Sequence, residues 1–171
     1  MNKVLAFIVV PLLLMACSSE SKTPTLEEQV YEFIFNELMQ DAATQIYISN
    51  RFEYGILSSE TLESLNQTYE QLADFPQELL SDLVSNTNSS ESLSWQPIMV
   101  NAKRIDSSSD QRESDYYYYV SDVSLNTETM EAVLLFGYYC PALCGAQDNL
   151  LFVKKFGPEW KIMAGVRLWV S

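Results

Sequence analysis

The sequence predicts an α+β domain in which N-terminal helices pack on one face of a C-terminal antiparallel meander sheet. Two observations lead to this prediction. Apolar residues recur at helical spacing through the first half of the chain, and short apolar strands separated by turn residues fill the second half. Helices and strands that occupy separate halves of a chain are typical of α+β folds. Residues 26–171 are long enough for one such domain.

Three stretches in the first half predict helices. Thr25 and Glu28 form a capping-box pattern, followed by apolar residues at helical spacing, so a helix is expected over residues 26–40. The spacing of leucine and tyrosine predicts a second helix over 59–73. Pro76 suits the first turn of a third, short helix that carries four aliphatic residues.

The remaining apolar stretches predict strands, over residues 44–49, 95–102, 116–125, 131–139, 149–156 and 160–170. The fourth carries the run AVLLFGYY and is expected to be central. Pro97 places the second at a sheet edge. In the last strand, alternate residues are expected to share one face: Trp160, Ile162, Ala164, Val166, Leu168 and Val170.

The first 17 residues have the pattern of an export signal. Val4–Ala16 is an apolar run of 13 residues after a single lysine, too short to span a bilayer as a helix. It ends in Leu14-Met15-Ala16-Cys17, which resembles the lipobox of bacterial lipoproteins. The resemblance implies that the signal, residues 1–16, is removed and that Cys17 receives lipid. The alternative is an ordinary signal or an uncleaved anchor, with Cys17 incidental.

The resemblance to lipoproteins also implies a location. Two or three acyl chains hold a protein firmly at a membrane, whereas one does so only marginally. Ser18 follows the cysteine where aspartate would favour retention in the inner membrane, so the expected location is the periplasmic face of the outer membrane. Residues 17–25 are small and polar and are expected to form a lipidated tether to a single domain, residues 26–171.

Charge and composition exclude several classes of function. The chain has no histidine, which rules out Ser-His-Asp and Cys-His catalysis and histidine-containing zinc sites. Without its signal the chain carries 23 acidic and 9 basic residues, a formal charge of −14. Such acidity argues against nucleic acid as a partner and against electrostatic docking on anionic lipid. No cofactor and no metal site are expected.

Several short motifs follow one another in the second half, namely Tyr139-Cys140, Leu143-Cys144-Gly145, Trp160-Lys161 and the terminal Leu168-Trp169-Val170-Ser171. Together they resemble a family of small exported bacterial proteins known only as uncharacterised. Pro141 stands where members often have glycine. The resemblance implies the fold class given above and implies no activity, substrate or catalytic residue.

Cys140 and Cys144 are the two cysteines left once Cys17 carries lipid. In an oxidising compartment they are expected to form a disulfide, provided that the chain turns between them, and Pro141 suits such a turn. Two alternatives remain. The pair could exchange electrons with other thiols, although the Cys-x-x-x-Cys spacing differs from that of thioredoxin-like proteins. It could also hold a metal such as copper.

Two further patterns have both a functional and a structural interpretation. Tyr116, Tyr118 and Tyr138 are weak candidates for an aromatic surface that binds sugar or peptide, but cross-strand packing of tyrosines explains them as well. Asp74, Glu78 and Asp82 recur every four residues. Although paired carboxylates can serve catalysis or bind calcium, a solvated helix face is the preferred interpretation.

The sequence therefore predicts a lipid-anchored periplasmic domain with a non-catalytic role in binding or in envelope maintenance. Its partners are expected to be the membrane, through Cys17, and an unknown envelope protein or small ligand. One alternative is an envelope hydrolase that uses carboxylates alone. Another is a lipoprotein that handles thiols or metal through Cys140 and Cys144.

Overall fold

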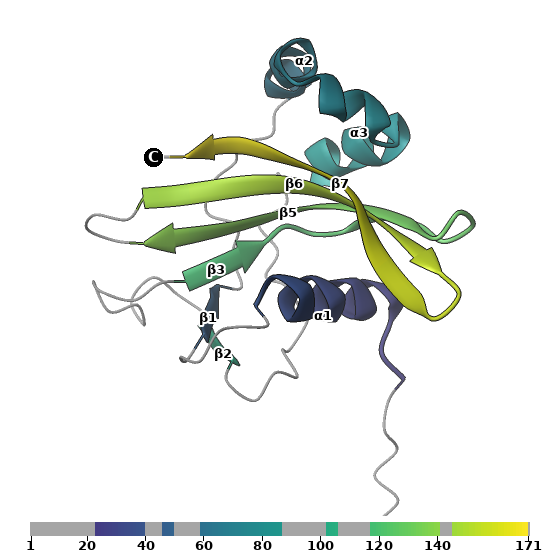
Figure 1. Ribbon diagram of the computed structural model, residues 1–171, viewed down its shortest axis with the longest axis vertical. Helices are drawn as coiled ribbons and strands as arrows, with labels where there is room; N and C mark the ends of the chain where they lie inside the picture. The colour runs from purple at the N-terminus through teal and green to yellow at the C-terminus, as the bar shows by residue number, and fades with distance from the viewer. Residues whose placement is uncertain are drawn as a thin grey trace, which may run out of the picture.

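The protein is described by a computed structural model that covers residues 23–39, 46–49, 59–86, 102–105, 117–140 and 145–170. Its helices are α1 (Leu26–Leu38), α2 (Ser59–Thr68) and α3 (Gln77–Asn86), with a 3-10 helix, η1 (Glu70–Asp74), before α3. The strands are β1 (Ile46–Ser49), β2 (Ala102–Ile105), β3 (Tyr117–Val120), β4 (Ser124–Asn126), β5 (Glu131–Cys140), β6 (Gly145–Phe156) and β7 (Glu159–Val170). Figure 1 shows helices above and below one twisted sheet, so the predicted α+β class is confirmed.

The sheet is mixed. Its strand order is β2-β1-β3-β5-β6-β7, and β4 pairs with β5 beside β3. Strands β5, β6 and β7 form the expected antiparallel meander, but β1 runs parallel to both β2 and β3. The prediction of a purely antiparallel sheet is therefore wrong at this edge. The helices α2 and α3 separate β1 from β2 along the chain, and such a crossover allows two neighbouring strands to run in the same direction.

The helices lie on both faces of the sheet, which corrects the prediction that they share one face. In Figure 1, α1 lies below the sheet and α2 and α3 lie above it. The reason is visible in β5 and β6, where consecutive residues rather than alternate ones are apolar. Leu134 is buried in the core on the α1 side, and its neighbour Leu135 is buried in the core on the α3 side. A strand that is apolar on both faces needs cover on both faces.

Helix α1 begins where the sequence predicts and packs through four buried residues, Val30, Tyr31, Ile34 and Phe35. The capping box forms: the backbone N–H of Glu28 donates to Thr25 Oγ1 at 3.1 Å, and that of Thr25 donates to Glu28 Oε2 at 2.7 Å. The Tyr31 hydroxyl donates to the carbonyl oxygen of Ser121 at 3.2 Å. Burial raises the pKa of this hydroxyl, so it remains a donor at any physiological pH.

The second core lies between α3 and the opposite face of the sheet. Leu72, Leu80 and Leu83 are fully buried against β5, β6 and β7. The helix predicted over 59–73 is interrupted, because Tyr69 adopts an extended backbone between α2 and η1. Its hydroxyl donates to the carbonyl oxygen of Leu168 in β7 at 3.3 Å. The break therefore places a tyrosine that fastens the helical layer to the edge of the sheet.

The strand predicted over 116–125 is divided into β3 and β4. Val120 pairs with Phe136, whereas Ser124 pairs with Val133, so the register changes by one residue between them. Ser121 bridges the interruption. Its backbone N–H donates to the Leu135 carbonyl oxygen at 3.0 Å, and its hydroxyl accepts from the Leu135 N–H at 2.8 Å. A side chain thus replaces one rung of the ladder at this bulge.

The last strand also departs from simple alternation. Phe152 pairs with Ala164 and Val153 with Ile162, which leaves Met163 as an extra residue in β7. Consequently Trp160 is buried on the α1 side, while Ala164, Val166 and Leu168 pack on the α3 side. The expectation that all alternate residues share one face is wrong, because an extra residue reverses the alternation beyond it.

Candidate functional site

A buried tyrosine–carboxylate pair lies on the α3 side of the sheet. Asp148 of β6 and Tyr119 of β3 are each 1% exposed, and the Tyr119 hydroxyl donates to Asp148 Oδ1. The two residues lie on either side of β5, where Gly137 is the Cα partner of both. A buried carboxylate needs hydrogen-bond donors, and this hydroxyl is one of them.

Gly137 makes the pair sterically feasible. A Cβ atom at this position would lie 2.4 Å from Asp148 Oδ1 and 2.4 Å from ring atoms of Tyr119. No real side chain fits such a space, so the tyrosine ring crosses β5 only because residue 137 has no side chain. The sequence carries one signal of this arrangement, since glycine inside an apolar strand often marks a close approach of another group to the backbone.

The surroundings of the pair are aromatic and closed. Tyr117 is buried beside Tyr119, with ring centroids 6.4 Å apart, and Tyr47 packs against them. Ser49 of β1 is buried as well and is the Cα partner of Tyr119. The hydrogen bond between Tyr119 and Asp148 joins β3 to β6 and so stabilises the sheet. Both residues are almost inaccessible to solvent. The arrangement offers no open surface to a substrate.

The tyrosines predicted as a binding surface lie on the other face. Tyr118 and Tyr138 are Cα partners, and their ring centroids are 6.2 Å apart. Tyr118 also stacks on Phe136 at 5.9 Å and packs against the core between the sheet and α1. These contacts are those of cross-strand packing, the structural interpretation of the tyrosines. Tyr116 lies outside the described residues.

The three acidic residues that recur every four positions behave as a solvated face. Asp74, Glu78 and Asp82 are all exposed. Among the described residues, no group of three or more metal-binding side chains of the aspartate, glutamate, cysteine and histidine types converges on one point.

The predicted disulfide falls partly outside the described residues. Cys140 is the last residue of β5 and Gly145 the first of β6, and the two are Cα partners. Residues 141–144 therefore connect adjacent antiparallel strands, as the prediction requires. Cys17 and Cys144 are not among the described residues, so lipidation and the disulfide both remain predictions.

Replacing Cys140 and Cys144 together with serine is expected to lower the free energy of unfolding by about 2 kcal/mol, because the chain-entropy contribution of so small a loop is limited. The melting temperature should fall by several degrees. Thermal unfolding with and without reductant measures the effect. The parent protein should show no reactive thiol with Ellman's reagent before reduction. Two free thiols in the parent would contradict the disulfide.

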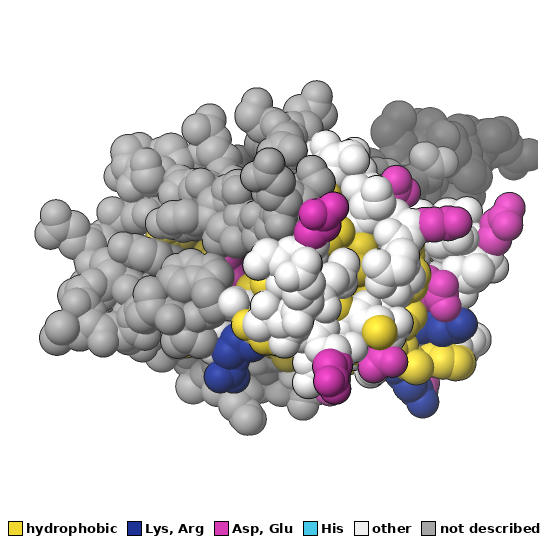
Figure 2. All heavy atoms as spheres, turned by 90° about the horizontal axis from the view of Figure 1, so that it is seen from above, with side chains coloured by type: hydrophobic (Ala, Val, Ile, Leu, Met, Phe, Trp, Pro, Cys, Tyr) yellow, Lys and Arg dark blue, Asp and Glu magenta, His cyan; other side chains and the backbone are white. Residues whose placement is uncertain are grey.

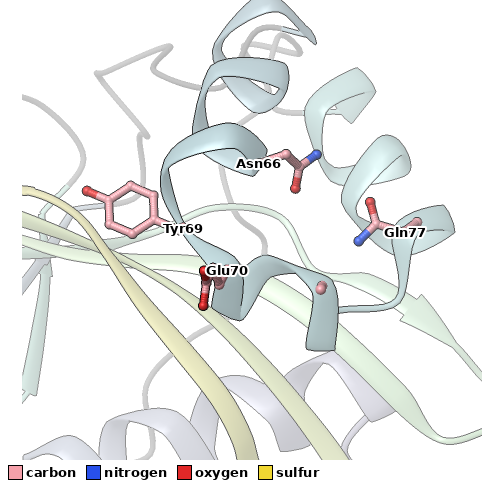
Figure 3. A pocket seen from close by; sticks show the side chains of 5 residues that line it. Asn66, Tyr69, Glu70 and Gln77 are labelled. Atoms are coloured by element: carbon pink, nitrogen blue, oxygen red, sulfur yellow. The ribbon is translucent and has the colours of Figure 1, made fainter.

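An open concavity lies in the helical layer. It has a volume of about 550 Å³ and is lined by five residues of α2, η1, α3 and their junctions, namely Asn66, Tyr69, Glu70, Ala73 and Gln77. Figure 3 shows the amide side chains of Asn66 and Gln77 pointing toward one another across the gap between the two helices. We call this feature the helix-layer concavity.

Local hydrogen bonds hold the helix-layer concavity in shape. The Gln77 amide nitrogen donates to the carbonyl oxygens of Leu72 at 3.0 Å and Phe75 at 3.1 Å, which fixes the turn between η1 and α3. Its amide oxygen can still accept. Asn66 and Glu70 are exposed and add an amide and a carboxylate at the rim. The lining thus offers donors and acceptors beside apolar surface, as sites for small polar ligands do.

The described structure is that of an α+β protein in which a mixed sheet lies between helices on both faces, with a buried tyrosine–carboxylate pair in the sheet and a polar concavity in the helical layer. Comparison with models of known protein families gives no match, and comparisons with curated proteins and with solved structures give none either. Within the described part of the chain, no helix is both long and apolar enough to cross a membrane.

Proposed function

We propose that this protein is a lipoprotein of the bacterial cell envelope that binds a small ligand rich in hydroxyl and amide groups, without transforming it. The lipid on Cys17 holds it at the periplasmic face of the outer membrane. The helix-layer concavity receives the ligand, and soluble peptidoglycan fragments are the candidate, since they combine sugar hydroxyls with peptide amides. The observation that carries the proposal is the pair of facing amides, Asn66 and Gln77, beside the carboxylate of Glu70.

The chemistry of the lining favours binding over hydrolysis. Amide groups both donate and accept, so they can pair with hydroxyls and with peptide groups. Glycoside hydrolysis by carboxylates requires two of them about 5 to 9.5 Å apart around one bond. The lining contains one carboxylate, Glu70, and the buried Asp148 serves the sheet. The alternative of a carboxylate hydrolase therefore has less support than binding.

Titration of soluble peptidoglycan fragments into the lipidated protein in detergent tests this proposal. Calorimetry should detect binding to the parent, and Asn66→Ala should weaken it about tenfold, the effect of one lost hydrogen bond of about 1.4 kcal/mol. Glu63→Ala is the matched control, because Glu63 is an exposed residue of α2 that does not line the concavity. Equal affinity of Asn66→Ala and the parent would contradict the site, and released cleavage products would establish the hydrolase instead.

Replacing Cys17 with serine should abolish incorporation of labelled fatty acid and move the protein out of the membrane fraction, since the lipid is the proposed anchor. The melting temperature should not change, because Cys17 precedes the proposed folded domain, residues 26–171. Membrane fractionation and metabolic labelling with a palmitate analogue measure the outcome. The Cys140→Ser and Cys144→Ser double variant is the control and should label like the parent. A Cys17→Ser protein that still labels would refute the anchor.

A further inference from the structure

The hairpin between β6 and β7 exposes large apolar side chains at its turn and in the adjoining part of β7. Phe156 is 47% exposed and Met163 is 49% exposed, and Ile162 beside it is 36% exposed. Met163 is the extra residue of the β7 bulge. Gly157 turns the chain with φ of +62°, which projects Phe156 at the end of the hairpin. We call Phe156, Ile162 and Met163 the apolar tip.

Lysines surround the apolar tip in a protein that is otherwise strongly acidic. Lys161 Nζ lies 5.9 Å from the centre of the Phe156 ring, and Lys155 Nζ lies 5.7 Å from that of Trp160. In Figure 2, dark blue and yellow side chains lie beside one another at one end of the described surface, with acidic side chains around them. Lys161 can extend its ammonium group toward lipid headgroups while its stem stays beside the ring of Phe156.

Acidic residues near the tip limit its positive charge. Lys154 Nζ forms an ion pair with Glu131 Oε1 at 2.8 Å, and the hydrogen bond from Lys154 lowers the pKa of Glu131, so this carboxylate stays ionised at neutral pH. Glu159 is the first residue of β7, directly after the turn. The positive and negative charges near the tip largely offset one another, so the tip itself adds little to the repulsion between this acidic chain and an anionic bilayer. Apolar contact is left as the driving force.

The apolar tip lies at the end of the molecule where the proposed lipid anchor enters. Lys155 Nζ donates to Gln29 Oε1 in the first turns of α1 at 2.6 Å. Figure 1 shows the amino-terminal end of α1 and the β6–β7 turn on the same side of the molecule. Cys17 precedes Thr23 by six residues, which can span no more than about 22 Å. A lipid on Cys17 therefore keeps this end of the domain close to the membrane.

We infer that the apolar tip is a second membrane contact, which inserts into the phospholipid bilayer that holds the lipid on Cys17. This contact orients the domain with the β6–β7 hairpin toward the lipid, while the helix-layer concavity lies on the face of the sheet opposite α1. The inference rests on the proposed lipid anchor. Exposed aromatic and aliphatic side chains flanked by lysines are the composition that bilayer interfaces accept.

A pair of tryptophan variants of the full-length lipidated protein tests the inference. Phe156→Trp places a reporter at the tip. Leu38→Trp places one at the opposite end of α1, about 18 Å from its start, where the native side chain is 43% exposed. Each is reconstituted into phosphatidylethanolamine–phosphatidylglycerol vesicles that contain lipids brominated in their acyl chains. Subtracting the emission of the parent, with its three tryptophans, isolates the added one.

The added tryptophan of Phe156→Trp should lose most of its emission in brominated vesicles, whereas that of Leu38→Trp should keep it. Substituting Met163→Ser in the Phe156→Trp protein should restore part of the emission. Equal quenching of the two reporters, or no quenching at residue 156, would overturn the membrane contact. A protein partner would then be the favoured occupant of the apolar tip. Labelling of Cys17 with lipid is checked on the same samples. Its absence would overturn the anchor itself, so the two failures are distinguishable.

Discussion

Replacing Gly137 with alanine is expected to lower the free energy of unfolding by about 3 kcal/mol, a large effect for one methyl group. The added Cβ would lie 2.4 Å from Asp148 Oδ1 and from the Tyr119 ring. Neither neighbour can retreat easily, since both are 1% exposed. Their hydrogen bond should therefore be lost along with the packing. Urea denaturation followed by tryptophan fluorescence measures the change.

Gly165→Ala is the matched control, because Gly165 also lies in a strand of the same sheet. Its added Cβ would lie 3.3 Å from Leu151 Cδ2, the end of a flexible side chain, and Gly165 is exposed. The change in the free energy of unfolding should stay within about 1 kcal/mol, partly because alanine restricts the unfolded chain. If the two substitutions lower the free energy of unfolding equally, close packing over residue 137 is not the reason that glycine stands there.

Replacing Tyr119 with phenylalanine is expected to lower the free energy of unfolding by about 2 kcal/mol. The ring and its packing beside Tyr117 are kept, so the loss measures the hydroxyl alone. The substitution removes a donor to the buried oxygen Oδ1 of Asp148, and a buried acceptor that loses a donor bears a desolvation cost of about 1–3 kcal/mol. Secondary structure should be preserved, which circular dichroism can verify.

A double-mutant cycle separates this bond from the other contacts of Asp148. Asp148→Asn keeps the shape of the side chain and removes its charge. In that background, Tyr119→Phe should cost clearly less than in the parent, with a coupling of about 1 kcal/mol or more, as is usual for side chains in direct contact. Strict additivity of the two substitutions would show that the hydroxyl and the carboxylate do not depend on each other.

Parts of the fold were predictable because they depend on short-range patterns. The capping box of Thr25 and Glu28 fixed the start of α1, and the hairpin from Glu131 to Phe156 followed from two apolar runs on either side of a turn. The candidate site was less predictable. The helix-layer concavity depends on the break at Tyr69, whose hydroxyl bonds to Leu168 about a hundred residues later in the chain. No local pattern encodes such a contact.

The same distinction explains the residues that sequence reasoning missed. Tyr119, Gly137 and Asp148 come from three strands and meet only when β3, β5 and β6 are aligned in register. The tyrosine run drew attention to Tyr116 and Tyr118, whereas Tyr119 is the member whose hydroxyl donates to the buried Asp148. Asp148 is one of 23 acidic residues, and no local pattern distinguishes it from the others. Its burial is a property of the assembled sheet.

By itself, the sequence determined the α+β class, the start of α1 and the β5–β6 hairpin, because propensity, capping and turns act over a few residues. The tertiary structure decided which face each helix covers, where β1 joins in parallel, and how the bulge at Met163 divides β7 between two cores. These features depend on which surfaces meet. The apolar strands β5 and β6 present apolar side chains to both sides, and burying both requires one helical layer above the sheet and another below it.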